Sequence, residues 1–532
     1  MKLLAQISMA LVLCTMGSVP AWSQVQAANP ANAIDNPQQG VIDKARRLLE
    51  EDRPAETLPL LSNLLMNGDE SDPVFADAQF LIAQALFNLN LPLAASYSFG
   101  DIAEMGEAHP RYYETIDWFL KIQRALPGDE ESLTRLAEYD PFLYPPKDAD
   151  EIRYLVGRHS YNQEDFEVAL ESFDSVEESA GILYLKSQYL IGVIRTRMNE
   201  AQPALEAFKN ILRYQRDVDS GPEIDRVSNM AILSLGRLFY TVGQYDTAIR
   251  YYDRIQKDNP SWLDSLFEAS WAYYKEDNFD RSMGNLHTLN SPYFEGDYLP
   301  EALVLQSVIL LKNCHFKAAK ETVERFEALY KPLHLELETQ LKTTADPNAF
   351  YTYLAKLSQQ DRKAELSLAL KRVFNAALQD AKLRRLLRFI ISLDTESKKF
   401  DKLLSGTNPG PTQDFLATTS SVLASYKAMV IADAGDAAMQ RLDRVYRELG
   451  GLLSQALRIK FETLQSERKM LAIEKQLSAD EVAAQRKATF PEPSPDEEHM
   501  YWPFDGEYWR DELGSYTSLI PNRCLSNPNV GR

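Results

Sequence analysis

Three segments of the chain repeat one spacing of small and aromatic residues. In each segment a glycine is followed twelve positions later by an alanine, and the alanine is followed four positions later by an aromatic residue. The three sets are Gly157, Ala169 and Phe173; Gly192, Ala204 and Phe208; and Gly236, Ala248 and Tyr252. Small residues let two helix backbones approach closely, and residues four apart share one helix face. The spacing therefore predicts stacked helix pairs, with these nine residues as packing positions.

The most complete segment, residues 232–260, resembles the tetratricopeptide repeat, a helix–turn–helix unit of about 34 residues. It also carries Gly243 where the turn belongs and Pro260 where the unit ends. Weaker copies extend the resemblance over about residues 75–332. The resemblance implies an all-α chain with a right-handed solenoid of roughly six to eight hairpins, whose concave face binds a peptide, helix or loop of another protein.

Beyond these repeats the sequence stays helical but loses the small–aromatic spacing. We expect residues 41–335 to form the tetratricopeptide-like α-solenoid, with Pro332 closing its last unit, and residues 336–487 to form a helical bundle or long α-hairpin. Within that bundle, apolar residues among many charges predict a long helix over 438–477. We expect residues 415–431 to fold back on this helix within one chain; pairing with a second chain is the alternative.

The first residues have the pattern of a secretory signal. Met1 and Lys2 precede a mostly apolar stretch over 3–16, and small residues follow it. We expect residues 1–23 to be removed on export and 24–40 to form a disordered linker. The apolar stretch is too short to span a bilayer, so we expect a periplasmic protein without a transmembrane segment. Lipid attachment at Cys14 is disfavoured, because Leu13 stands where a small residue is needed.

Two cysteines, Cys314 and Cys524, remain after removal of the signal. An oxidising compartment permits a disulfide between them, but the sequence does not show whether their Cα atoms come close enough. We expect two unpaired thiols, with Cys314 in the turn of a helical hairpin.

Residues 488–532 are expected to form a proline-rich linker and an aromatic tail. The six rings of the tail are Tyr501, Trp502, Phe504, Tyr508, Trp509 and Tyr516. One interpretation is that these rings pack on the chain's own helices. The other is that they dock a partner, for which Trp502, Phe504, Tyr508 and Trp509 are the candidates. The run 502–513 resembles the C-terminal ends of periplasmic repeat proteins from gliding and predatory bacteria.

Charge and motifs limit the function. The formal net charge of −20 repels phosphate backbones and anionic lipid, so nucleic acid is a poor partner. His-Glu-x-x-His, Cys-x-x-Cys, Gly-x-Ser-x-Gly and the phosphate-binding glycine loops do not occur. We therefore expect no catalytic, cofactor-binding or metal-binding residues.

The combined expectation is a non-catalytic scaffold that binds proteins in the bacterial cell envelope. It would belong to a multi-protein complex for motility, secretion or outer-membrane assembly. The alternative is a regulator of a peptidoglycan synthase or hydrolase that acts by protein contact. The sequence leaves the partner and the oligomeric state open.

Overall fold

The computed structural model describes residues 37–68, 72–218, 221–343, 346–358, 381–488 and 500–525, together with positions 373 and 497. Every regular element among these residues is a helix, as the sequence predicts. The predicted signal peptide (1–23), most of the predicted linker (24–40) and the proline-rich run 491–495 lie outside the described residues.

The first sixteen α-helices of the described chain pair consecutively into eight antiparallel hairpins, which agrees with the expected number. Short 3₁₀ turns, η1 (Gly106–Ala108), η2 (Pro141–Leu143), η3 (Glu178–Ala180) and η4 (Pro292–Phe294), lie in some of the connections between hairpins. The hairpin helices are α1 (Pro37–Glu50), α2 (Pro54–Asn67), α3 (Pro73–Asn88), α4 (Pro92–Met105), α5 (Thr115–Ala125), α6 (Glu130–Glu138), α7 (Ala149–Asn162), α8 (Phe166–Asp174), α9 (Ile182–Arg197), α10 (Ala201–Asp217), α11 (Pro222–Thr241), α12 (Tyr245–Tyr252), α13 (Trp262–Lys275), α14 (Phe279–Leu289), α15 (Pro300–Lys312) and α16 (Phe316–Thr343).

The turn inside each hairpin contains one residue with a left-handed backbone. The eight residues are Asp52, Asn90, Gly128, Glu164, Asn199, Gly243, Asp277 and Cys314. Asparagine, aspartate and glycine reach this conformation at the lowest cost, and they occupy six of the eight positions. The expected turn at Gly243 and the expected place of Cys314 in a turn are thus confirmed.

Proline begins many of the helices. It stands at the first position of α2, α3, α4, α11 and α15. Proline favours this position because its fixed φ suits a helix and its missing N–H would have no partner there. The start of α3 is also capped, since the Asp72 carboxylate accepts a hydrogen bond from the Val74 N–H at 2.9 Å.

The last hairpin helix, α16, is longer than the sequence suggests. It runs through Pro332, so the expected end of the unit at that proline is wrong, and the expected boundary between residues 335 and 336 falls inside the helix. An interior proline costs about 3 kcal/mol. Burial of Phe326, Leu333 and Leu337 against the neighbouring helices offsets this cost.

The helices of the described residues after α16 are α17 (Pro347–Ser358), α19 (Ala381–Ser405), α20 (Pro411–Glu474) and α21 (Ala479–Ala488). The glycine- and proline-rich residues 406–410 separate α19 from α20. The expected fold-back of 415–431 is wrong, because these residues belong to the same uninterrupted 64-residue helix as 438–474. Glycines inside a helix cost about 1 kcal/mol each, which is less than the packing along α20 contributes.

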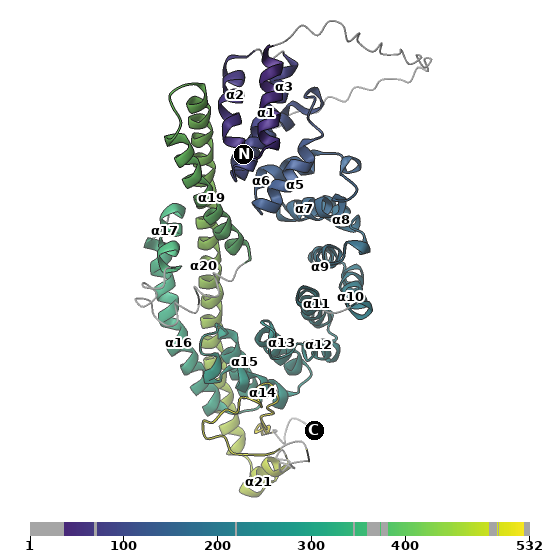
Figure 1. Cartoon of the computed structure of the whole chain (residues 1–532). Helices are drawn as coiled ribbons and strands as arrows, with labels where there is room; N and C mark the ends of the chain where they lie inside the picture. Colours follow the sequence, from purple (N-terminus) through teal and green to yellow (C-terminus); the bar gives the residue numbers. More distant parts are fainter. Residues whose placement is uncertain are drawn as a thin grey trace, which may run out of the picture.

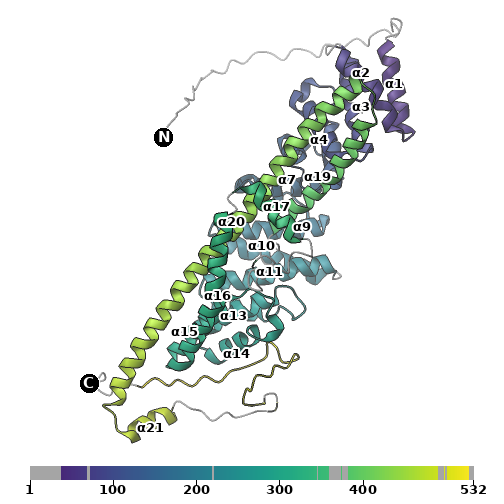
Figure 2. The same ribbon diagram turned by 90° about the vertical axis from the view of Figure 1, so that its left-hand side faces the viewer.

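The hairpins form a curved row, called the arc here, and the long helix α20 runs straight from one end of the arc to the other. We call α20 the chord helix. Figure 1 shows the hairpins curving around one side, with α9, α11 and α13 facing α20 and α10 and α12 on the opposite side. Figure 2 shows α20 running along the length of the molecule, beside α19 in its upper half and α16 in its lower half. The arc and the chord therefore form one framework.

Two hydrophobic cores fix the ends of the arc to this chord. The first joins α1–α7 to α19 and to the part of α20 before position 435. The second joins α15, α16 and α17 to α20 residues from 438 onward. At the start of α20 the hydroxyls of Ser62 and Thr412 are hydrogen-bonded at 2.9 Å. This hydrogen bond joins α2 to α20, whose residues are about 350 positions apart in the sequence.

A buried carboxylate reinforces the first of these contacts. Glu396 on α19 accepts hydrogen bonds from the Leu93 and Ala94 N–H groups, each at 3.0 Å, at the N-terminus of α4. The first N–H groups of a helix have no partner within that helix, so a side chain from elsewhere satisfies them. The Glu396 side chain is buried, and burial raises its pKa to about 7 despite the two donors.

One helix of the described chain, α20, is long and apolar enough to cross a membrane by length and composition. Those two criteria do not separate a membrane helix from a long helix in a folded bundle. In this structure α20 packs against α2, α4, α15, α16, α17 and α19.

Candidate partner-binding surface

The three small–aromatic sets come together as helix–helix contacts. A Cβ placed at Gly157 would lie 2.8 Å from the Phe173 ring, and one at Gly192 or Gly236 would lie 2.5 Å from the Phe208 or Tyr252 ring. The alanines of the three sets, Ala169, Ala204 and Ala248, are fully buried beside them. Pro260 lies exposed in the connection between α12 and α13. These contacts position the inner helices.

The inner face carries a pocket directly next to this packing. Its volume is about 420 Å³, and its lining comes from three helices. Arg237, Tyr240 and Thr241 belong to α11, Tyr252 to α12, and Glu268 and Trp271 to α13. Three aromatic rings around a small number of charged groups are typical of a ligand pocket.

A two-point ion pair crosses the pocket. The Arg237 Nη2 and Nε atoms donate to Glu268 Oε1 at 2.6 and 2.9 Å. Burial alone would lower the pKa of Arg237, but the hydrogen bonds and charge of Glu268 outweigh it, so the pKa lies above its ordinary value. Burial and then the charge of Glu268 raise the pKa of the nearby Asp264 carboxyl. The pair holds the side chains of α11 and α13 in fixed positions.

Of the residues that line this pocket, sequence reasoning singled out Tyr252, as a packing residue, and missed the other five. Arg237 directly follows the packing glycine Gly236, and Trp271 directly follows Ser270, the equivalent small residue of the next hairpin. In these two hairpins the position after the small residue therefore lies in the pocket lining. This offset is the signal that would have found Arg237 and Trp271.

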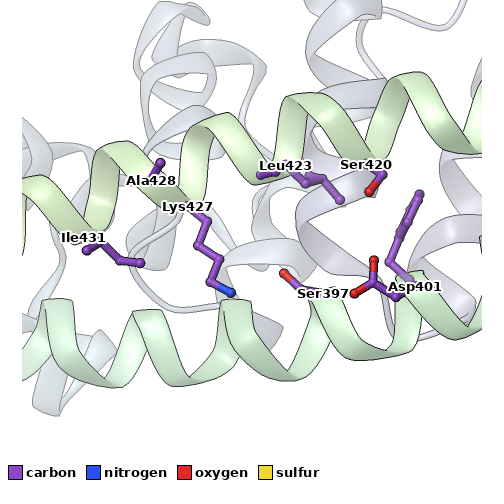
Figure 3. A pocket seen from close by; sticks show the side chains of 9 residues that line it. Ser397, Asp401, Ser420, Leu423, Lys427, Ala428 and Ile431 are labelled. Carbon is purple, nitrogen blue, oxygen red and sulfur yellow. The ribbon is translucent and has the colours of Figure 1, made fainter. Parts of the chain in front are cut away.

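Figure 3 shows a second cavity, of about 360 Å³, along the seam between α19 and α20. Lys427 points across the seam and pairs with Asp394 of α19. The carboxylate of Asp401 and the hydroxyls of Ser397 and Ser420 complete the polar lining. The lining contains no histidine or cysteine, and its charged groups are the Asp401 carboxylate and the Lys427 ammonium. It is part of the helix seam.

The C-terminal tail is attached to the end of the arc. Cys314 and Cys524 form a disulfide with their Cα atoms 5.1 Å apart, so the expectation of two unpaired thiols is wrong. The tail backbone brings Cys524 to this turn, because the Arg523 N–H donates to the Asn313 carbonyl at 3.0 Å. This approach depends on the docking of the tail, which the spacing of two cysteines does not reveal.

Two of the four predicted docking rings, Phe504 and Tyr508, contact one histidine of α14. The His287 ring stacks on Tyr508 and meets the edge of Phe504, each at a centroid distance of 4.6 Å. Trp502 and Trp509 stack on each other at 4.7 Å. Burial lowers the pKa of His287, which is partly offset by the charge of Glu507. The tail therefore makes intramolecular contacts while still exposing part of its rings.

Among the described residues, no group of three histidine, cysteine, aspartate or glutamate side chains is placed to hold a metal ion.

Residues 233–284 match the family model described as "Tetratricopeptide repeat". The match covers the C-terminal part of α11, all of α12 and α13, and the beginning of α14, which includes every residue that lines the inner pocket. This segment is thus a tetratricopeptide repeat, as its sequence resemblance indicates. No curated protein sequence matches the chain.

Solved structures of repeat proteins resemble the chain at low scores. The apo form of RapI is 12% identical with a TM-score of 0.34, over 65% of this chain and 99% of that one. The apo quorum sensor NprR of B. thuringiensis is 16% identical with a TM-score of 0.29, over 62% and 95%. A tetratricopeptide repeat protein of Parabacteroides merdae is 12% identical with a TM-score of 0.24, over 55% and 92%. Likenesses this low say nothing about what the chain binds.

The repeat match, the stacked hairpins and the pocket on their inner face together define the class. Within the described residues the chain is an all-helical protein of stacked hairpins, with a tetratricopeptide repeat that carries a pocket on its inner face.

Proposed function

We propose that this protein is a non-catalytic adaptor of the bacterial cell envelope, which binds a polypeptide segment of a partner on the inner face of its arc. The observation that carries the proposal is the ring-walled pocket formed by α11, α12 and α13 inside the matched repeat. Pockets of this kind bury most of a side chain that enters them, and their few polar groups orient it.

The order of the surrounding framework supports the binding of a partner. The two-point contact between Arg237 and Glu268 and the glycine–aromatic packing behind it hold the pocket walls before a partner arrives. A wall that is already ordered loses little conformational entropy on association. The chord helix α20 also limits how far the arc can open.

The Cys314–Cys524 disulfide supports placement outside the cytoplasm, because structural disulfides persist in oxidising compartments. This agrees with the secretory pattern of residues 1–23. We propose the periplasm, and within it a multi-protein complex of the motility, secretion or outer-membrane assembly type. The resemblance of the run 502–513 to tails of periplasmic repeat proteins points in the same direction.

Site-specific photo-crosslinking in the native envelope tests the proposal. A photoreactive residue replaces Thr241, which is exposed at the rim of the pocket. The matched control replaces Val168, which is exposed on the outer helix α8. We expect Thr241 to give a cross-linked envelope protein and Val168 to give none, with the yield falling about tenfold in a Trp271→Ala background.

The identity of the captured protein decides between the two envelope roles. A motility, secretion or assembly component supports the adaptor, whereas a peptidoglycan synthase or hydrolase supports the regulator of cell-wall enzymes. Equal cross-linking from both positions, or none from Thr241, would contradict binding on the inner face.

A further inference from the structure

The C-terminal strap, defined here as residues 500–525, is held in place by more than its disulfide. The Ser518 and Ile520 N–H groups donate to the Asp280 carbonyl and carboxylate at 3.0 and 2.8 Å, and the Gly514 N–H donates to Thr288 Oγ1 at 2.9 Å. Figure 2 shows the strap in yellow running past the end of the arc near α14. Its backbone is therefore ordered against the solenoid.

The close fit of the strap depends on a small residue of α14. A Cβ at Gly284 would lie 1.8 Å from the Tyr516 carbonyl oxygen, so a side chain there would displace the strap. Tyr516 itself is buried, and its hydroxyl accepts from the Trp509 N–H at 2.8 Å. The conformation of the strap is thus stabilised both by its contact with α14 and by hydrogen bonds within the strap.

Despite this anchoring, the strap turns large aromatic side chains toward solvent. Tyr501 is 59% exposed, Phe504 49% and Trp509 40%. Contacts to Tyr508, His287, Tyr516 and Trp502 link the Phe504 and Trp509 rings into one cluster. Aromatic rings that are fixed in position and still accessible are typical anchors of protein interfaces. Such rings lose little conformational entropy on binding, because they are already ordered in the free protein.

The strap itself carries mostly negative charge, although Lys257 of the solenoid donates to the Asp511 carbonyl and the charge of Arg325 acts on Tyr508. Between 505 and 512 the strap has four carboxylates, Asp505, Glu507, Asp511 and Glu512, against one guanidinium, Arg510, for a net charge of −3. An acidic rim attracts basic partners and repels the anionic head groups of a bilayer surface. The surface therefore fits a polypeptide rather than a lipid membrane.

We propose that the strap is a second docking surface, which binds a basic segment of a protein partner through its exposed rings and acidic rim. The proposed segment carries apolar side chains for contact with Phe504 and Trp509 and lysine or arginine for contact with the neighbouring carboxylates. No strap residue lines the pocket of α11–α13. Loss of binding at the strap can therefore be distinguished from loss of binding at the pocket, and one proposal can be wrong while the other holds.

A selection of random twelve-residue peptides on the intact, oxidised protein tests the proposal. Peptides that bind are then measured by fluorescence polarisation against Trp509→Ala and against the double reversal Asp505→Lys with Asp511→Lys. The control is Phe142→Ala, which removes a ring that is 96% exposed at a distant turn. The charge reversal leaves every ring in place, so it remains informative even if Trp509→Ala disturbs the strap.

We expect the selected peptides to be rich in lysine or arginine next to apolar residues. We also expect them to bind at least about tenfold more weakly to both strap variants and unchanged to the control. Recovery of no peptide that distinguishes the variants, or enrichment of acidic peptides, would overturn the proposal. So would binding of the intact protein to phosphatidylglycerol vesicles that Trp509→Ala abolishes, because the rings would then serve a membrane.

Discussion

The ring of Tyr252 on α12 lies directly against Gly236 on α11, so that a Cβ at position 236 would stand 2.5 Å from the ring edge. This contact sets the separation of two helices whose residues line the inner pocket. The packing of the repeat and the geometry of its candidate binding surface are therefore coupled.

Gly236→Ala should accordingly loosen the α11–α12 hairpin. Overpacking a fitted contact costs about 1–3 kcal/mol, and Gly236→Trp should unfold the hairpin locally, as should Ala248→Trp. Hydrogen exchange of the α11 and α12 amides measures the effect. The control is Gly40→Ala in α1, where a Cβ meets nothing within 4 Å, and where the helix should gain up to about 1 kcal/mol. Equal protection in Gly236→Ala and the unchanged protein would refute the contact.

Two glycines of α20 should respond in opposite directions. A Cβ at Gly435 would lie 2.0 Å from the Pro347 carbonyl oxygen of α17, whereas one at Gly451 meets nothing within 4 Å. We expect Gly435→Ala to destabilise the α17–α20 contact by about 1–3 kcal/mol and Gly451→Ala to stabilise α20 by up to about 1 kcal/mol. Urea unfolding followed by circular dichroism compares them. The same sign for both variants would mean that α17 does not approach Gly435 this closely.

The disulfide should control the docking of the strap. Closing a long loop contributes about 2–4 kcal/mol, so replacing both cysteines by serine should speed exchange of the Ser518, Ile520 and Arg523 amides by roughly a hundredfold. Exchange in α7–α10, which the strap does not touch, is the internal control. Unchanged protection in the serine variant would show that the hydrogen bonds to the solenoid suffice alone.

Glu396 should make the α4–α19 contact depend on pH. Its folded-state pKa of about 7 lies above the unfolded value of about 4.3, so the folded protein binds the extra proton between these pH values. The free energy of unfolding should therefore fall as pH rises through this window, by at most about 4 kcal/mol. The difference between the protein and Glu396→Gln, measured by urea unfolding from pH 4 to pH 8, isolates this group. A difference that stays constant with pH would rule out the raised pKa.

The helix pairs of the repeat region could be predicted from the sequence because the residues that specify each pair lie close together in the chain. Gly236, Ala248 and Tyr252 lie within seventeen positions, and their spacing specifies both the close helix crossing and the ring that fills it. The same pattern could have located two residues of the pocket, because Arg237 and Trp271 each follow a small packing residue by one position. The packing positions alone do not indicate that these neighbours line a pocket.

The second half needed the folded molecule. The sequence predicts that the last repeat unit ends at Pro332, yet α16 passes through this proline. Gly435 likewise lies inside α20. Burial of Phe326, Leu333, Leu442 and Val445 outweighs the local cost of the proline and the glycine. An apolar pattern shows that a helix has a buried face but does not show which helix covers it.

The sequence by itself determined the all-helical repeat, its packing residues and the expectation of a protein-binding surface. Tertiary structure alone decided that α20 closes the arc, that Cys314 meets Cys524, and that the aromatic strap lies on α14. The physical reason is the distance along the chain. Contacts within one hairpin follow from residue spacing, whereas contacts between residues 210 or 350 positions apart depend on the arrangement of every helix between them.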